Sequence, residues 1–232
     1  DETLIDAWLC AKSEKNGKFY DIFRNRVMFP IIDLRGNIIG FGGRVLDDSK
    51  PKYLNTNKTL VFDKGNNLFS LNFARNSASK KLILAEGYMD VIMLNQAGFD
   101  NAVATLGTSV TSSHAVKLKR YCDELLLCYD SDNAGQKASQ RAINILSEAG
   151  ISAKIIKMED AKDPDEYIKK FGADRFRRLT DDSEDANLFM LERCAENIDI
   201  NTEQGKIEFI KRAVRFLAGI QNTIERDIYI SK

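Results

Sequence analysis

The sequence predicts an α/β protein in which helices flank a parallel sheet, with a basic mixed α/β part before the sheet and a helical part after it. Three observations lead to this prediction. From about residue 80, short apolar runs alternate with helix-length segments, which is typical of βαβ units. Before residue 80, two strand-like runs flank a glycine-containing connection, and after about residue 184 only helical periodicity remains. We therefore expect three domains, covering residues 1–79, 80–170 and 171–232.

The elements of the first domain are a short helix and polar turn, then a hairpin, then a loop. The two strand-like runs at 27–33 and 37–46 enclose Leu34-Arg35-Gly36, which indicates a hairpin. A polar loop with several lysines is expected over 47–59. The sheet is expected to contain strands at 80–87, 101–107, 124–130 and 152–158, separated by helices at 88–98, 112–121 and 133–150. In the last domain, helices are expected at 186–198 and 203–220.

Composition is that of a soluble protein with a core, and the charge is unevenly distributed. No run of 18 apolar residues is present, and the N-terminus lacks the features of a signal peptide, so we expect a cytoplasmic protein without a membrane span. The four cysteines have no zinc-binding spacing and are expected to be buried, reduced thiols. The single histidine, His114, is expected at the surface. Residues 12–81 carry a net charge of +8 and residues 82–232 one of −5, which favours a polyanion-binding face beside a cation site.

Acidic residues follow the predicted strands. In a parallel sheet, ligands bind at the carboxyl ends of the strands. These ends carry six carboxylates: Glu86 and Asp90 after the first strand, Asp130 and Asp132 after the third, and Asp163 and Asp165 beyond the fourth. Each group has a simpler reading as helix caps or first-turn acids. A calcium-binding loop at Asp130 is excluded, because Ala134 and Arg141 occupy positions that need oxygen ligands.

Taken together, the six carboxylates predict a site for a hard divalent cation. All-oxygen ligands without His or Cys select Mg²⁺ or Mn²⁺, which bind substrate phosphates. Two such ions support transfer or hydrolysis at phosphorus.

The basic residues before residue 80 favour phosphate contact. Arg24 and Arg26 are two positions apart at the start of a strand, so both are expected to point the same way. The segment "GFGGR" at 40–44 either lets a phosphate approach or marks a bend in the strand. In the following loop, lysines are accompanied by Asn55, a combination that suits contact with a nucleic-acid backbone.

Several motifs resemble a known family. "EGYMD" at 86–90, "YDSDNAG" at 129–135 and "DPDEYI" at 163–168 resemble the TOPRIM domain. The upstream segments "FYDIFRNRVMFPI", "GNIIGFGGRVL", "PKYLNT" and "FDKGNNLF" narrow this to a resemblance with the catalytic core of the bacterial DnaG-type DNA primase family. The resemblance implies a TOPRIM-type sheet and DNA-templated synthesis of short RNA primers by two-metal nucleotidyl transfer at the replication fork.

The resemblance also implies roles for particular residues. Catalysis is expected from Glu86, Asp90, Asp130 and Asp132, and metal binding from Glu86, Asp130, Asp132, Asp163 and Asp165. Contacts to DNA or nucleoside triphosphate are expected from Arg24, Arg26, Arg44, Lys52, Asn55 and Lys64.

The expected partners are a single-stranded DNA template, an RNA primer and ribonucleoside triphosphates, with Mg²⁺ or Mn²⁺ as cofactor. Zinc is expected only in an N-terminal domain, and the replicative helicase only at a C-terminal domain, both absent from this sequence. The core is expected to be monomeric. Two alternatives remain, namely a TOPRIM nuclease or topoisomerase subunit, and a non-catalytic single-stranded DNA-binding module.

Overall fold

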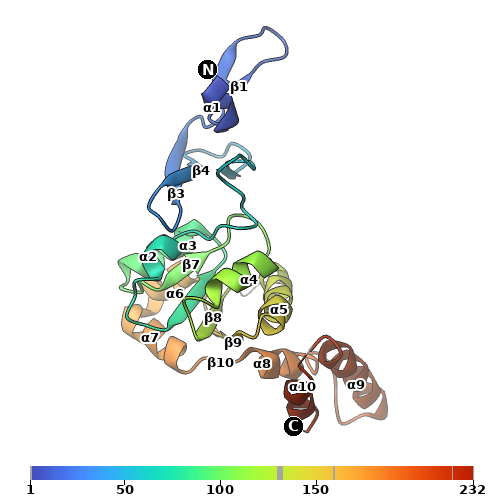
Figure 1. The fold of residues 1–232 in the computed structure, drawn as a ribbon. Coiled ribbons are helices and arrows are strands. Elements are labelled where there is room, and N and C mark those ends of the chain that lie inside the picture. The colour runs from blue at the N-terminus through green and yellow to red at the C-terminus, as the bar shows by residue number, and fades with distance from the viewer. Residues whose placement is uncertain (1, 130–132, 159, 221, 232) are drawn as a thin grey trace.

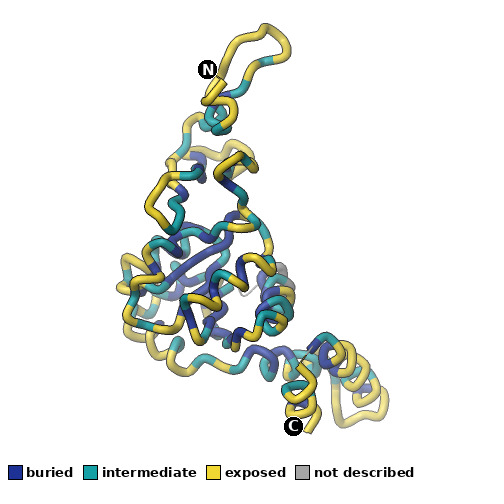
Figure 2. Tube along the Cα trace, in the orientation of Figure 1, coloured by how far each residue is buried: buried dark blue, intermediate teal, exposed yellow. Residues whose placement is uncertain are grey.

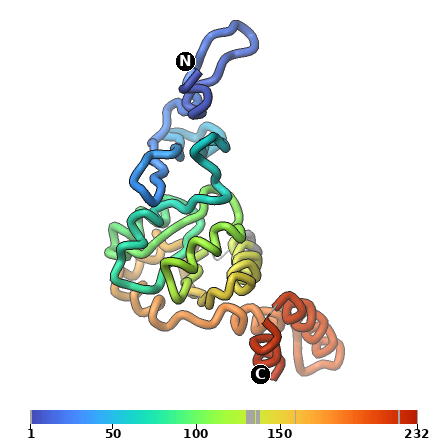
Figure 3. The backbone as a smooth tube through the Cα atoms, viewed as in Figure 1, coloured from blue at the N-terminus to red at the C-terminus, as the bar shows by residue number. Residues whose placement is uncertain are grey.

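The computed structural model describes residues 2–129, 133–158, 160–220 and 222–231 of the chain. The molecule is elongated, with its two termini at opposite ends (Figures 1 and 3). The N-terminal elements are α1 (Glu2–Asp6), β1 (Cys10–Lys12), β2 (Phe19–Asp21), β3 (Arg26–Ile32), β4 (Ile38–Val45), β5 (Tyr53–Asn55) and α2 (Leu71–Ala74). The central elements are β6 (Lys81–Ala85), α3 (Tyr88–Gln96), β7 (Ala102–Ala104), α4 (Ser112–Leu118), β8 (Glu124–Cys128), α5 (Asn133–Glu148), β9 (Ser152–Ile155) and α6 (Pro164–Phe171). The remaining elements are α7 (Ala173–Asp181), β10 (Glu184–Asp185), α8 (Ala186–Arg193), α9 (Glu203–Leu217) and α10 (Thr223–Ile230).

The central sheet has the order β10-β9-β8-β6-β7, and its four longer strands are parallel. The predicted α/β class is thereby confirmed. Successive residues of β6 face opposite sides: Leu82 and Leu84 pack in one core cluster, whereas Ile83 and Ala85 pack in the other. Both faces are covered, which explains why these strands read as continuous apolar runs. Figure 2 shows the buried residues concentrated in this central part.

Different helices cover the two faces of the sheet. One cluster contains buried residues of α4, α5 and α8, and the other contains residues of α3, α6 and α7. Phe176 of α7 is completely buried, although it lies beyond residue 170, where we expected the sheet domain to end. The short strand β10 was not predicted, and it pairs with β9 at the edge of the sheet.

The predicted hairpin is confirmed as β3 and β4, which pair antiparallel from Arg26↔Val45 to Ile32↔Ile38. The segment expected to be a polar loop contains a third strand, β5, paired with β4 at Gly42↔Asn55, Gly43↔Leu54 and Arg44↔Tyr53. Its three residues are too few to show a strand pattern in the sequence. This antiparallel sheet lies next to the carboxyl ends of the parallel strands (Figure 1).

The C-terminal helices α8, α9 and α10 lie at the far end of the molecule (Figure 1), and buried residues of all three, among them Met190, Phe216 and Tyr229, belong to the core cluster on one face of the sheet. Their N-caps are Asp185, Thr202 and Asn222, each of which accepts a backbone N–H with its side chain. Within the described ranges, none of the helices combines the length and apolar character needed to cross a lipid bilayer.

Candidate catalytic site

Four of the six predicted acids come together at the carboxyl edge of the parallel sheet. Glu86 follows the end of β6, and Asp90 lies in the first turn of α3, where its Oδ2 accepts the N–H of Gly87 at 3.0 Å. Burial, and to a smaller extent the negative charges of Asp163, Glu86 and Asp165, together raise the pKa of Asp90 to about 6, against the lowering effect of the hydrogen bond from Gly87. The effect of these charges on Asp90 shows that the carboxylates of two separate segments of the chain, 86–90 and 163–165, lie close together.

Asp163 and Asp165 begin helix α6. Asp163 is the N-cap, and its Oδ1 accepts the backbone N–H of Glu166 at 2.8 Å, with Pro164 following at the first helical position. The cap interpretation of "DPD" is therefore correct for Asp163. One oxygen of Asp165 is bound by Lys169 at 2.6 Å, and the other, Oδ1, is buried without a partner among the described residues.

Asp130 and Asp132 lie outside the described residues. The last paired positions of the adjacent strands are Ala85 on β6 and Cys128 on β8. Tyr129 follows directly, and burial together with the charge of Glu86 raises its pKa. Among the residues that the structure describes, no cluster of three or more His, Cys, Asp or Glu side chains forms a complete metal site.

A cavity of about 350 Å³ joins the acidic edge to the antiparallel sheet. Its acidic wall contains Glu86, Asp90 and Asp163, and its other wall contains Lys52, Tyr53 and Asn55 from β5 and the residue before it. Basic and acidic residues therefore meet in one cavity, although Asn55 lies 31 positions from Glu86 and 108 positions from Asp163 in the sequence.

The other predicted basic residues, Arg24, Arg26, Arg44 and Lys64, are not among the residues that line this cavity. The guanidinium of Arg26 donates to the carbonyl oxygens of Pro51 at 2.9 Å and Gly43 at 3.2 Å, so it holds the loop before β5. Arg24 lies over the ring of Tyr20 at 5.5 Å. Asn25 between the two arginines has a φ of 51°, so the alternation expected of a strand does not apply to this pair.

Arg44 and Lys64 have different surroundings. The guanidinium of Arg44 lies over the ring of Tyr53, 5.8 Å from its centroid, and so lies beside the cavity rather than in its wall. The backbone carbonyl of Lys64 is bound by His114, and Lys64 is not among the residues that line the cavity.

The surface position expected for His114 is wrong. The side chain is completely buried, and both ring nitrogens have partners there. Nδ1 accepts the N–H of Thr111 at 3.3 Å, and Nε2 lies 3.0 Å from the carbonyl oxygen of Lys64. Burial lowers the pKa of His114, so the imidazole is neutral at pH 7. The polar helical stretch around it gave no sign of this, since the buried contacts come from a loop about 50 residues earlier.

Sequence reasoning did not name several residues of the cavity wall, among them Tyr88, Thr105, Gly107 and Lys162. Tyr88 lies inside the motif "EGYMD" and is only 4% exposed. Burial raises the pKa of its hydroxyl to about 12. Lys162 directly precedes the "DPD" motif, so adjacency to a motif was the one signal available for both.

The glycines of "GFGGR" lie against side chains. A Cβ at Gly40 would meet Thr56 and Phe62, and one at Gly43 would meet Phe23 and Arg26, all at 2.9–3.4 Å. Their role is therefore close packing of the antiparallel sheet.

Three family models match successive parts of the chain. Residues 1–75 match the DNA primase catalytic core, N-terminal domain; residues 83–168 match the Toprim-like family; and residues 189–232 match the DnaB-helicase binding domain of primase. The last match overturns our expectation that the chain holds no helicase-binding segment. That expectation arose because helical periodicity alone carries no information about a partner.

Relatives and solved structures agree with these matches. A DNA primase of Clostridium acetobutylicum is 46% identical over 230 residues, covering 99% of this chain and 38% of the relative, so the chain spans about two fifths of that protein. A crystal structure of a DNA primase domain from Pseudomonas aeruginosa is 39% identical with a TM-score of 0.87, covering 98% of this chain and 73% of that one. A DnaG primase catalytic domain bound to ssDNA is 36% identical with a TM-score of 0.84, covering 99% and 75%. Because sequence, family models and fold agree along nearly its whole length, this chain belongs to the bacterial DnaG-type DNA primase family.

Proposed function

We propose that this chain is the catalytic core of a primase that joins ribonucleotides on a single-stranded DNA template by nucleotidyl transfer. The observation that carries the proposal is the cavity in which Lys52, Tyr53 and Asn55 face Glu86, Asp90 and Asp163. A triphosphate needs cationic contacts on one side and carboxylates that hold its counter-cation on the other, and both occur in this cavity.

The acidic residues fit Mg²⁺ or Mn²⁺. All are oxygen ligands, Asp90 is half-buried near three further carboxylates, and Asp165 Oδ1 has no hydrogen-bond partner within the described part of the chain. Glu86, Asp163 and Asp165, with Asp130 and Asp132, are the residues proposed to hold the cation. When bound, the cation would neutralise phosphate charge and activate the attacking hydroxyl.

The protein side chains supply positioning. Lys52 is exposed at the rim of the cavity and would bind phosphate oxygens, whereas Asn55 is held by a hydrogen bond from its Nδ2 to the carbonyl oxygen of Leu106 at 3.1 Å. Tyr53, 40% exposed, presents a ring on which a base could stack. Holding the two reactants in one orientation contributes several kcal/mol to such reactions, about 7–11 in well-ordered cases.

Partners follow from the relatives. One relative's catalytic domain is bound to single-stranded DNA, and we propose the same ligand for this chain. The match of residues 189–232 supports contact with a replicative helicase through α8–α10. For its oligomeric state and location, we propose that the core is a monomer that acts at the replication fork in the bacterial cytoplasm.

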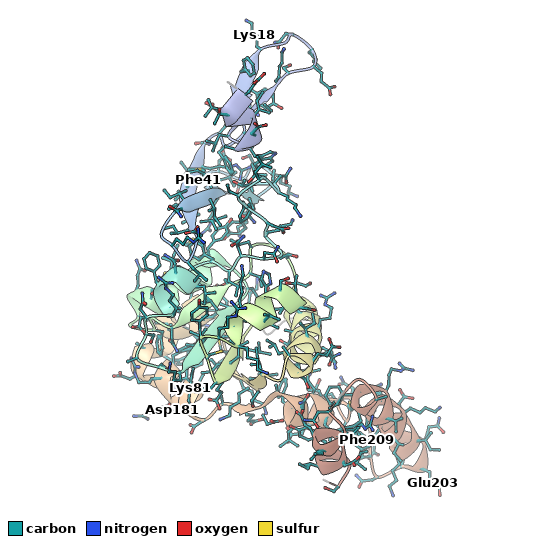
Figure 4. The ribbon with its side chains drawn as sticks, viewed as in Figure 1. Lys18, Phe41, Lys81, Asp181, Glu203 and Phe209 are labelled. Carbon is teal, nitrogen blue, oxygen red and sulfur yellow. The ribbon has the colours of Figure 1, made fainter. Side chains whose placement is uncertain are left out.

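The test compares Glu86→Gln with Asp181→Asn in the full-length protein. Asp181 is also acidic, but it lies with Lys81 at the opposite edge of the sheet (Figure 4). Glu86→Gln should abolish Mg²⁺-dependent incorporation of labelled ribonucleotides while single-stranded DNA is still bound, and Asp181→Asn should act as the wild type. Unimpaired synthesis by Glu86→Gln would refute the assignment, and nicking of supercoiled DNA without synthesis would favour the nuclease alternative.

A further inference from the structure

The two walls of the candidate site belong to different sheets, and the ring of Tyr88 lies between them. Tyr88 is the first residue of α3, on the parallel-sheet side, directly between Glu86 and Asp90 in the sequence. Its ring packs in a core cluster with Ile31 of β3 and Leu106, which follows β7. One buried side chain therefore contacts both parts of the fold.

The antiparallel sheet rests directly on this ring at Gly42. A Cβ added to Gly42 would lie 3.0 Å from Cε1 and Cζ of Tyr88 and 3.1 Å from Oδ1 of Asn55. These distances are shorter than ordinary carbon–carbon contacts of about 3.5–4.0 Å, so only glycine permits this approach without displacement. Because Gly42 is paired with Asn55, any displacement of β4 here moves β5, which carries the basic wall of the cavity.

The ring cannot move away to relieve such a contact. Aromatic neighbours surround it: the ring centroids of Phe29, Tyr53 and Phe69 lie 5.0, 5.4 and 5.6 Å from its own. Its hydroxyl is buried and has no hydrogen-bond partner among the described residues. The contact therefore depends on the shape of the ring rather than on the hydroxyl.

Asn55 forms a second link between the same two parts. Its Nδ2 donates to the carbonyl oxygen of Leu106, and a Cβ on Gly107 would lie 3.1 Å from that nitrogen. Gly107 has a φ of +68°, which glycine adopts readily. Two glycines, one on each side, thus allow the close approach of the sheets at the cavity.

We propose that Tyr88 and Gly42 are positioning residues that set the separation between the basic strand β5 and the acidic edge of the parallel sheet. The inference rests on the proposed function, because the walls must be correctly spaced to hold one triphosphate between Lys52 and the carboxylates. Gly42 is not among the residues that line the cavity, and Tyr88 lines it but is proposed to act through the packing of its ring. Each acts through the walls it holds.

The test uses four variants of the full-length protein: Gly42→Ala, Tyr88→Leu, Tyr88→Phe and the double variant Gly42→Ala/Tyr88→Leu. Gly42→Ala should lower kcat for primer synthesis about tenfold or more, since small misplacements of reactants cost large factors in rate. Affinity for single-stranded DNA and for Mn²⁺ should each stay within about twofold of wild type, because each wall alone is unchanged. Tyr88→Phe keeps the ring and should retain clearly more turnover than Tyr88→Leu, and the double variant should recover part of the turnover lost in Gly42→Ala.

Gly40→Ala is the matched control. It adds the same methyl group to the same strand, but its neighbours at 3.2–3.3 Å, Thr56 and Phe62, precede the parallel sheet in the chain. It should lower the Tm without lowering kcat in proportion. If the ratio of the loss in kcat to the loss in Tm is the same in Gly42→Ala and Gly40→Ala, the effect on turnover comes from stability alone and the proposal is overturned. So would equal damage by Tyr88→Phe and Tyr88→Leu, or a double variant no better than Gly42→Ala.

A distance measurement separates this inference from the proposed function. Spin labels at the exposed positions Leu46, after β4, and Val116, on α4, report the spacing of the two parts without any activity. The distance distribution should shift or broaden in Gly42→Ala and stay as in wild type in Gly40→Ala. An unchanged distribution in Gly42→Ala refutes the positioning role even if synthesis occurs. If the wild-type protein shows no metal-dependent synthesis, the proposed function is refuted. The positioning role of Tyr88 and Gly42 is then still tested by the distance measurement.

Discussion

The Nε2 atom of His114 lies 3.0 Å from the carbonyl oxygen of Lys64, which ties the start of α4 to the loop that precedes α2. Because a carbonyl oxygen can only accept, Nε2 carries the proton and Nδ1 is left to accept the N–H of Thr111. Lys117, one turn later on α4, donates to the carbonyl of Asn66 in the same loop. The loop is therefore held by α4 at two points.

This arrangement predicts a loss of stability in mild acid. The pKa of His114 is lowered from 6.5 by burial, so below that pH the unfolded chain binds more protons than the folded one. The stabilising effect is full above pH 6.5 and declines as the pH falls through the lower folded pKa; Asp63 and Lys117 are the charged neighbours. Urea unfolding of wild type and His114→Leu at pH 7.5 and 5.5 measures this. At pH 7.5, His114→Leu should be less stable than wild type by about 1–3 kcal/mol. Lowering the pH to 5.5 should reduce the stability of wild type more than that of the variant, which has no imidazole to protonate. An equal reduction in both proteins would contradict the prediction.

Arg26 and Lys52 should affect DNA binding for different reasons. Arg26 binds the carbonyls of Pro51 and Gly43, so Arg26→Ala leaves these groups unpaired and should lower stability by about 1–3 kcal/mol along with DNA affinity. Lys52→Ala should keep the Tm and weaken binding, reducing the salt slope of the affinity by about one. Thermal unfolding and salt titrations of single-stranded DNA binding distinguish the two. A Tm unchanged in Arg26→Ala would show that its backbone contacts contribute little.

Phe176 should be essential for the stability of the parallel sheet, although it lies on α7. Its ring is completely buried and packs edge-on against Phe99, with centroids 5.0 Å apart. Phe176→Ala should cost about 3–5 kcal/mol in chemical denaturation. Phe73→Ala is the control, because that side chain is 60% exposed and its loss should change stability by about 0.5 kcal/mol or less. Similar effects of the two substitutions would place α7 outside the cooperative core.

The parallel sheet could be predicted from sequence because its strands are buried on both faces and its helices are long enough to show periodicity. The residues that join the two walls could not. Gly42 contacts Tyr88 across 46 positions of sequence, and the burial of His114 depends on a loop 50 positions earlier. Periodicity reports only which face of an element is apolar. It does not report which distant backbone that face meets, so the acids at strand ends were found and the contacts that orient them were not.

Asp163 offers a way to separate helix capping from metal binding. Its Oδ1 caps α6 through the N–H of Glu166, and its charge contributes to the field at Asp90. Asn is as good an N-cap as Asp but carries no charge. Ala neither caps the helix nor carries a charge, and losing the cap lowers stability by about 0.5–2 kcal/mol. Asp163→Asn should therefore keep the Tm but weaken Mn²⁺ binding and Mg²⁺-dependent synthesis about tenfold or more, and Asp163→Ala should lower both the Tm and these activities. Calorimetry and Mn²⁺ titration measure the two effects independently. Wild-type metal affinity in Asp163→Asn would show that this carboxylate serves only as a cap and that the cation, if bound, is held by the remaining acids.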